Sequence, residues 1–114
     1  MKVIHFKGAE TYEPDEGWKR VSLCNEKSIS VEYFTKPPGH SSPMHQHPHE
    51  QVMIVLKGRM KVVTPEGEEE LEEGDAVYIP PEEPHRVENV LGEPSIGIDI
   101  FCPGRPFDFW KKRG

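Results

Sequence analysis

The chain has 114 residues, of which 34% are hydrophobic, and a formal net charge of −6. This length supports one domain rather than two, so we expect a single domain over residues 1–114. The negative balance argues against a nucleic-acid partner, which needs clustered Lys and Arg, and gives no reason to expect an anionic membrane surface as a partner. No stretch has the pattern of a membrane span or a signal peptide, and the two cysteines lie far apart. We therefore expect a reduced, cytoplasmic protein.

Short strands are predicted along the whole chain, because 12 prolines and 10 glycines favour turns over long helices. Segments with apolar or alternating patterns are the expected strands: residues 3–6, 18–23, 29–34, 51–56, 59–63, 68–71, 76–79, 85–90 and 95–101. Segment 51–56 is almost entirely apolar, which predicts burial on both faces. The glutamate-rich stretch 66–73 is expected to be a solvent-exposed hairpin. This spacing of strands is typical of an all-β sandwich or barrel.

Histidines gather just before segment 51–56 and are candidate metal ligands. His45 and His47 are two residues apart, so on an extended segment both imidazoles point to the same side and can converge on a transition metal. Gln51 follows at the head of the next strand, and His85 comes just after a proline turn later in the chain. We expect these four side chains to hold one divalent ion. The alternative is a set of surface or loop histidines without a metal.

Neighbouring polar residues compete for the same role. Glu50 could replace Gln51 as a ligand, but on a regular strand it points to the opposite face, so Gln51 is preferred. His40 and His49 flank the cluster, and Pro48 disturbs the local geometry. For these two histidines we expect a place beside the site or in solvent.

Two ordered motifs carry a resemblance to a known family. The segment Gly39-x5-His45-x-His47-x3-Gln51-x6-Gly58 resembles the first cupin motif, and Gly74-x5-Pro80-x4-His85-x3-Asn89 resembles the second. Glu82 departs from the second motif, which usually has a glycine two residues after its proline. The resemblance covers residues 25–103 and leaves a C-terminal tail at 104–114. It implies a cupin-type double-stranded β-helix, which is a jelly-roll barrel, and homodimers that pair through an outer sheet face.

Neutral ligands would shape the chemistry of the bound ion. Three imidazoles and one amide leave the +2 charge of Ni, Mn, Fe or Zn uncompensated, which makes the ion a stronger Lewis acid. An octahedral ion with four protein ligands keeps two positions for a bidentate hydroxy or keto acid. Asp99 and Phe101 share one face of a strand. If that face lines the barrel, Asp99 could transfer protons, and Arg105 could grip a substrate carboxylate. The alternatives are a surface aspartate and a solvated tail.

A narrower resemblance follows from segment 45–51 together with Asp99-x-Phe101-x-Pro103-x-Arg105. These residues are similar to the KdgF-type cupins, which convert cyclic 4,5-unsaturated uronates into linear keto forms. The resemblance implies a metal held by His45, His47, Gln51 and His85. It also implies functional roles for Asp99, Phe101 and Arg105 in ring opening and tautomerisation of a small sugar acid. The rival hypotheses are an iron-dependent cupin oxygenase or thiol oxidase, and a non-catalytic module that binds a small acid.

Overall fold

The computed structural model describes residues 1–113, which form nine strands, a 3-10 helix and one α-helix. Their bounds are η1 Phe6–Gly8, β1 Thr11–Asp15, β2 Trp18–Asn25, β3 Ser30–Lys36, β4 Glu50–Lys57, β5 Arg59–Thr64, β6 Gly67–Glu72, β7 Ala76–Ile79, β8 Arg86–Asn89, β9 Ser95–Cys102 and α1 Phe109–Arg113. The all-β class is confirmed, and most of the expected strands are present.

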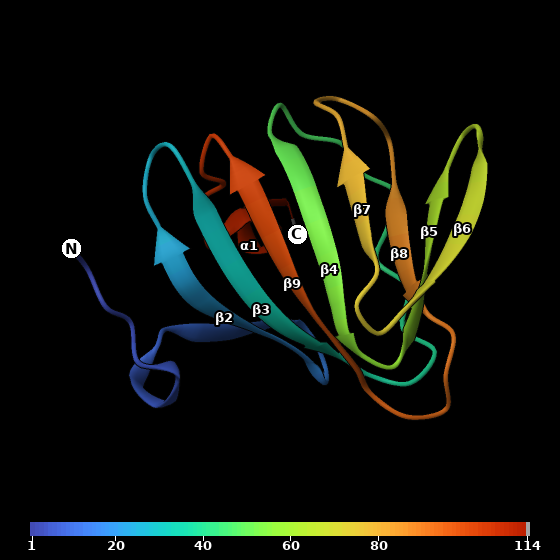
Figure 1. The fold of residues 1–114 in the computed structure, drawn as a ribbon, viewed down its shortest axis with the longest axis horizontal. Coiled ribbons are helices and arrows are strands. Elements are labelled where there is room, and N and C mark those ends of the chain that lie inside the picture. The colour runs from blue at the N-terminus through green and yellow to red at the C-terminus, as the bar shows by residue number, and fades with distance from the viewer. Residues whose placement is uncertain (114) are drawn as a thin grey trace.

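Two antiparallel sheets face each other and enclose the interior (Figure 1). The larger sheet has six strands in the order β1-β2-β3-β9-β4-β7, and the smaller has three in the order β6-β5-β8. Strands far apart in the sequence become neighbours: β9 lies between β3 and β4. This arrangement is the double-stranded β-helix that the motifs imply.

Alternation along each strand decides which side chains enter the barrel. In β9 buried and half-buried residues alternate without exception, and β3 has the same pattern. The inward side chains of both sheets join in one apolar cluster that includes Met53, Val55, Met60 and Val62. Burial of each such side chain contributes about 1.5–3 kcal/mol relative to exposure, so the register of the strands is fixed by this face.

Segment 51–56 is buried on one face only, which corrects the expectation of burial on both. Gln51, Met53 and Val55 point inward and are buried, whereas Val52 and Ile54 are half-buried on the outer face. The reason is that β4 belongs to a sheet with only one face inside the barrel. The expected glutamate-rich hairpin is confirmed as exposed, since β6 buries only Leu71.

The N-terminal expectation was wrong. Residues 3–6 form no strand and are exposed, and the first strand is β1, which pairs with β2. β1 was missed because its alternation is interrupted by Pro14 and it buries no residue fully. An edge strand needs little apolar content, so sequence pattern alone gives a weak signal there.

The segment between β3 and β4 carries His45 and His47, and β8 fixes its path. Backbone bridges join Ser41 to Glu88 and His45 to His85. Asn89 is fully buried, and its amide Nδ2 donates to the carbonyl of Lys36 at 3.0 Å. The segment therefore lies against the smaller sheet although β4 belongs to the larger one.

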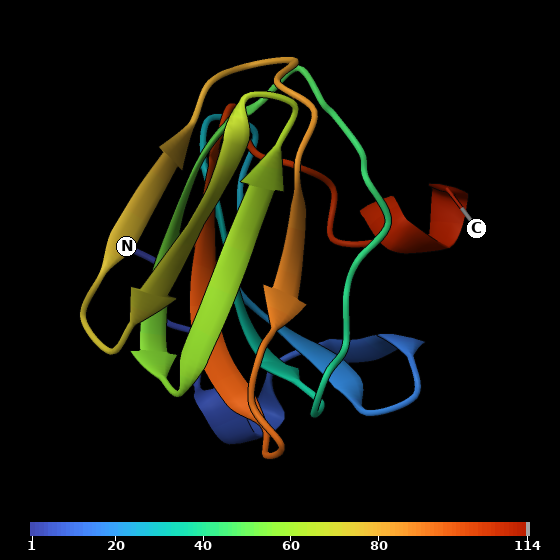
Figure 2. The same ribbon diagram turned by 90° about the vertical axis from the view of Figure 1, so that its right-hand side faces the viewer.

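The C-terminal tail folds back over the barrel. Phe107 is buried, and α1 follows it beside the segment that precedes β4 (Figure 2). The ring of Trp110 packs against that of Trp18 with centroids 5.0 Å apart. Within residues 1–113 no helix is long and apolar enough to cross a membrane.

Glu82 has a left-handed backbone conformation, with φ of +64°. It occupies the position where the second motif usually has glycine, so the departure noted in the sequence falls on a residue whose conformation favours glycine. The backbone N–H of Glu82 donates to the carbonyl of His47 at 2.8 Å, so this turn also touches the histidine segment.

We predict that Glu82→Gly is tolerated, because relief of the left-handed strain offsets the extra entropy of glycine in the unfolded chain. Glu82→Val should lower the free energy of unfolding by about 1–2 kcal/mol relative to Glu82→Gly, because a β-branched residue is strained at positive φ. Urea denaturation of both variants measures the difference. Equal stabilities would show that the turn relaxes to another conformation.

Candidate metal centre

Three histidines converge on one point inside the barrel. His45 and His47 lie in the segment before β4, and His85 immediately precedes β8, across the backbone bridge from His45. One ligand atom from each lies within 4.8 Å of those of the other two. All three side chains are buried. The parity argument from the sequence thus places His45 and His47 together, and the fold brings His85 to meet them.

Backbone carbonyls fix the tautomer of each ring. Nδ1 of His45 lies 2.9 Å from the carbonyl oxygen of Pro43, and Nδ1 of His85 lies 2.8 Å from that of Glu83. Nδ1 of His47 has the same relation to the carbonyl of His49 at 3.0 Å. A carbonyl oxygen only accepts, so each Nδ1 carries the proton and each Nε2 presents a lone pair. This is the arrangement in which imidazole binds a metal through Nε2.

Gln51 adds an oxygen to the same point. Its Nε2 donates to the Oδ1 atom of Asp99 at 2.9 Å, so its Oε1 is turned to Nε2 of His47, 3.0 Å away. Both facing atoms are acceptors when His47 is neutral. Two lone pairs at this distance repel each other unless a cation lies between them. Nε2 of His85 is also buried without a partner.

The histidines are held in the neutral form that a metal requires. Burial, together with the neighbouring His85 and Arg105, lowers the pKa of His45 to about 3. Burial and Arg105 lower the pKa of His47 to about 4. The pKa of His85 is lowered too, chiefly by burial. Neutral imidazoles whose Nε2 lone pairs point to one place, together with an amide oxygen, form a ligand set that fits a divalent transition ion.

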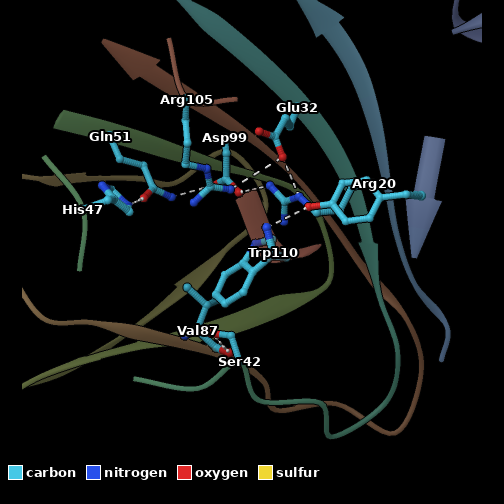
Figure 3. A network of polar contacts seen from close by, with 10 residues as sticks. Arg20, Glu32, Ser42, His47, Gln51, Val87, Asp99, Arg105 and Trp110 are labelled. Carbon is cyan, nitrogen blue, oxygen red and sulfur yellow. Dashed lines mark hydrogen bonds and ion pairs between the residues drawn. The ribbon is translucent and has the colours of Figure 1, made fainter. Parts of the chain in front are cut away.

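A chain of buried polar contacts extends from Gln51 into the barrel (Figure 3). The Oδ2 atom of Asp99 accepts from Nη2 of Arg20 at 2.7 Å, and Nε of Arg20 donates to Oε1 of Glu32 at 2.6 Å. These residues come from four neighbouring strands, β2, β3, β9 and β4. The position of Gln51 is therefore set by Asp99, and that of Asp99 by Arg20.

Phe101 and Arg105 lie beside the histidines. Phe101 is fully buried, and its ring centroid is 5.6 Å from that of His47. The guanidinium carbon of Arg105 lies 3.9 Å from the ring centroid of Phe101 and 4.2 Å from that of Phe109. Arg105 also lies 3.6 Å from Glu32. The fold thus brings Asp99, Phe101 and Arg105 together, and the burial of Arg105 argues against the alternative of a solvated tail.

A cavity of about 320 Å³, which includes its open mouth, is lined by His45, Gln51, His85, Asp99 and Arg105. Trp110 from α1 also lines it, with its ring 4.6 Å from that of His45. Arg105, the carboxylate of Asp99 and three of the four candidate metal ligands therefore line one space.

Some residues near the site behave as the sequence suggested. Glu50 is exposed and Gln51 is buried, so Gln51 is the residue that joins the histidines. His40 is half-buried and contacts Asp15 at 2.9 Å, away from the ligand set. His49 is also half-buried, and its ring lies 5.3 Å from that of His47.

Three buried charged residues were missed: Arg20, Glu32 and Lys36. A signal for them was present in the alternation. Arg20 shares the face of the buried Trp18, and Glu32 and Lys36 share that of the buried Phe34. In a two-residue period, a charged side chain on an apolar face points into the barrel.

The sequence matches the family described as Cupin domain over residues 32–101, more than half of the chain. Among solved structures, an RmlC-like cupin from Shewanella frigidimarina has a TM-score of 0.84 and 26% identity, covering 96% of both chains. KdgF from Halomonas sp. also has a TM-score of 0.84, with 22% identity, and covers 96% of this chain and 98% of that one.

A curated relative, glucose-6-phosphate isomerase from Thermococcus gammatolerans, is 38% identical over 80 residues. The match covers 68% of this chain and 41% of that protein. The chain spans between 26% and 54% of the length of the curated relatives that it matches.

We predict that the metal-free protein loses stability as pH falls from 6.5 toward 5. The folded pKa values of His45 and His47 lie below the ordinary 6.5, so the unfolded chain binds protons that the folded chain excludes. Each histidine should lower the free energy of unfolding by up to about 1.4 kcal/mol per pH unit in this window.

Urea denaturation at pH 7.5, 6 and 5 measures the slope. His45→Gln removes one titrating group and should reduce the slope, whereas His5→Gln, which changes an exposed histidine, should not. A free energy of unfolding that stays constant over this range would mean that the rings titrate normally and are not buried together.

Proposed function

The chain belongs to the cupin domain family, and on that premise we propose that it is a metal-dependent enzyme acting on a small sugar acid. The reaction that we propose is the ring opening and tautomerisation of a 4,5-unsaturated uronate. One observation carries the proposal: Asp99 lines the same cavity as His45 and His85, and it accepts a hydrogen bond from Gln51, the proposed fourth ligand. A carboxylate for proton transfer thus adjoins the proposed metal ligands.

His45, His47, Gln51 and His85 would hold the ion. A divalent ion bound there supplies a Lewis acid that draws electron density from substrate oxygens. Nickel, manganese, iron and zinc all suit these nitrogen and oxygen donors.

The reaction needs protons to move but needs no oxidant. The C1 hydroxyl loses its proton to a base and becomes a carbonyl, the bond from C1 to the ring oxygen breaks, and its electron pair leaves an enolate at C5. The proton then adds to C4, and the enolate becomes a ketone. We assign this proton movement to Asp99, which faces the cavity. Arg105 lines the same cavity and would hold the carboxylate, while the ring of Phe101 packs against its guanidinium and would keep it in place.

Similar proteins support a sugar-acid substrate. KdgF from Halomonas sp. shares the fold across nearly the whole chain, and His45, Gln51, His85, Asp99 and Arg105 of the KdgF-type motif line one cavity. Glucose-6-phosphate isomerase from Thermococcus gammatolerans is named for an isomerisation of a sugar. A sugar acid as substrate suits a cavity that is lined by cationic side chains and a carboxylate.

We also propose that two copies pair through the outer face of the larger sheet. Val52 pairs with Ile100 and Ile54 with Ile98 in adjacent strands, and all four are half-buried on that face. An apolar sheet face of this kind is commonly covered by a partner. Light scattering that gives the mass of a single chain at micromolar concentration would reject the dimer.

Cys24 and Cys102 are free thiols, which fits a reducing compartment such as the cytoplasm.

The activity is tested with 4,5-unsaturated galacturonate, by following the absorbance of its conjugated enol. The metal-loaded protein should accelerate the loss of absorbance, and Asp99→Asn should lower kcat by about a hundredfold or more, as expected for loss of a general acid–base. Glu50→Gln, which changes an exposed carboxylate next to Gln51, should leave the rate unchanged.

Metal content is measured on each variant, so that a lost ion is not mistaken for a lost proton donor. No acceleration over buffer by the metal-loaded wild type would reject this substrate class. Oxygen consumption that accompanies turnover would favour the oxygenase, because ring opening consumes none. Ligand binding without turnover of any sugar acid would favour the binding module.

A further inference from the structure

Lys36 is a buried amine in the same cavity as the candidate metal ligands. It is the last residue of β3, and its side chain is only 1% exposed. It lines the cavity together with His45 and His85. Its Nζ lies 4.3 Å from the ring centroid of Trp18, which lines the cavity too. Neither residue has a role in the proposed reaction.

Lys36 has no acidic partner in the part of the chain that the structure describes. No carboxylate oxygen in residues 1–113 lies within 4.0 Å of its Nζ. The two buried carboxylates, Glu32 and Asp99, are both paired with Arg20. Buried cations are almost always paired, because an isolated one is costly to desolvate. An unpaired lysine inside a barrel therefore needs an explanation.

Other donors that line the cavity also lack acceptors. Nε1 of Trp18 is buried with no hydrogen-bond partner, and so is Nε of Arg105. In proteins such groups are usually satisfied, so a donor left open on a cavity wall points to a ligand atom that accepts from it. The open donors lie on the same cavity as Lys36.

The charges of the interior do not balance. The buried cationic side chains are Arg20, Lys36 and Arg105, whereas the buried carboxylates are Glu32 and Asp99, so three positive groups meet two negative ones. A divalent ion at the histidines would add two more positive charges. Burial and the nearby Arg20 lower the pKa of Lys36 to about 7, and Asp99 and Asp15, both farther than 4.0 Å from its Nζ, offset this only in part.

We propose that the ammonium of Lys36 and the indole N–H of Trp18 form a second anion-binding subsite, so that the cavity selects small acids with two anionic groups. One group lies beside Arg105 and the metal ligands, and the other accepts from Lys36 and Trp18. The inference rests on the metal site of the proposed function and not on the uronate reaction. A 4,5-unsaturated uronate brings one carboxylate, so a doubly charged acid of similar size is the better ligand.

The test compares ligands that differ in one charge. Malate carries a hydroxy-acid end, which suits a divalent ion, and a second carboxylate; its 4-amide has the same shape without the second charge. The pair of 2-hydroxyglutarate and its 5-amide extends the reach by one carbon. Calorimetric titration of the nickel-loaded protein should give an affinity at least about tenfold higher for one of the diacids than for its amide, as expected for a buried charge pair.

Lys36→Met should remove this preference by weakening only the diacid. Lys19→Met is the matched control, because Lys19 is an exposed lysine on the adjacent β2, paired with Thr35 in β3. The control should keep the wild-type ratio. Equal affinities for diacid and amide in both wild-type pairs would overturn the inference, and so would a ratio that Lys36→Met leaves intact. The wild-type comparison needs no variant to fold.

Thermal stability separates a binding role from a structural one. If Lys36 serves a ligand, Lys36→Met removes an unpaired buried charge and its Tm should equal or exceed that of the wild type. If Lys36 instead holds the fold through Trp18, the Tm should fall and the ligand preference should survive, which would overturn the inference.

The experiment also keeps this inference distinct from the proposed function. Titration of the metal-free protein should show the same preference for the diacid at lower affinity, because Lys36 and Trp18 are not metal ligands. A protein that fails to open unsaturated uronates but prefers diacids supports the subsite and rejects the reaction. If the protein opens unsaturated uronates but shows no preference for diacids, the result supports the reaction and rejects the subsite.

Discussion

The site depends on several hydrogen-bond acceptors that face one another inside the barrel. The Nδ1–H of each of the three histidines donates to a backbone carbonyl, so three Nε2 lone pairs face a common point. Gln51 cannot relieve them, because its amide N–H is engaged by Asp99 and only its oxygen faces His47. Burial keeps the rings from protonating. A cation at this point would relieve the repulsion among these buried acceptors.

That constraint organises the rest of the interior. Asp99 orients Gln51, Arg20 neutralises Asp99, and Glu32 balances Arg20, so the polar chain crosses the larger sheet from β4 to β2. The apolar cluster occupies the remaining inner face and fixes the strand register that makes these contacts possible. Lys36 makes no ion pair with any member of this series of charges in the described part of the chain. Function at a cavity often retains a charge that stability alone would not.

Much of the site could be predicted because it is encoded in local parity and in motif spacing. His45 and His47 are two positions apart, and the same parity selects Gln51 over Glu50; the structure buries Gln51 and exposes Glu50. The prediction of His85 as a ligand depended on the second motif, because no local pattern shows which residues of opposite sheets come together. The alternation in segments 18–23 and 29–34 was enough to find β2 and β3.

The remainder depends on tertiary context. Segment 51–56 looked buried on both faces because its composition is apolar, and composition does not show whether a sheet has one or two covered faces. The inward charges on β2 and β3 break the rule that barrels fill with apolar residues, and only the fold reveals which carboxylate meets which cation. The turn at Glu82 shows the converse: the motif indicated a glycine conformation, and the chain adopts it with another residue.

The most direct test is a crystal structure of the protein grown with nickel, with anomalous data collected at the metal absorption edge. The account predicts one anomalous peak per chain, bonded to Nε2 of His45, His47 and His85 and to Oε1 of Gln51. A barrel without a peak at saturating nickel, or a peak bonded through Nδ1 or to residues elsewhere, would contradict it.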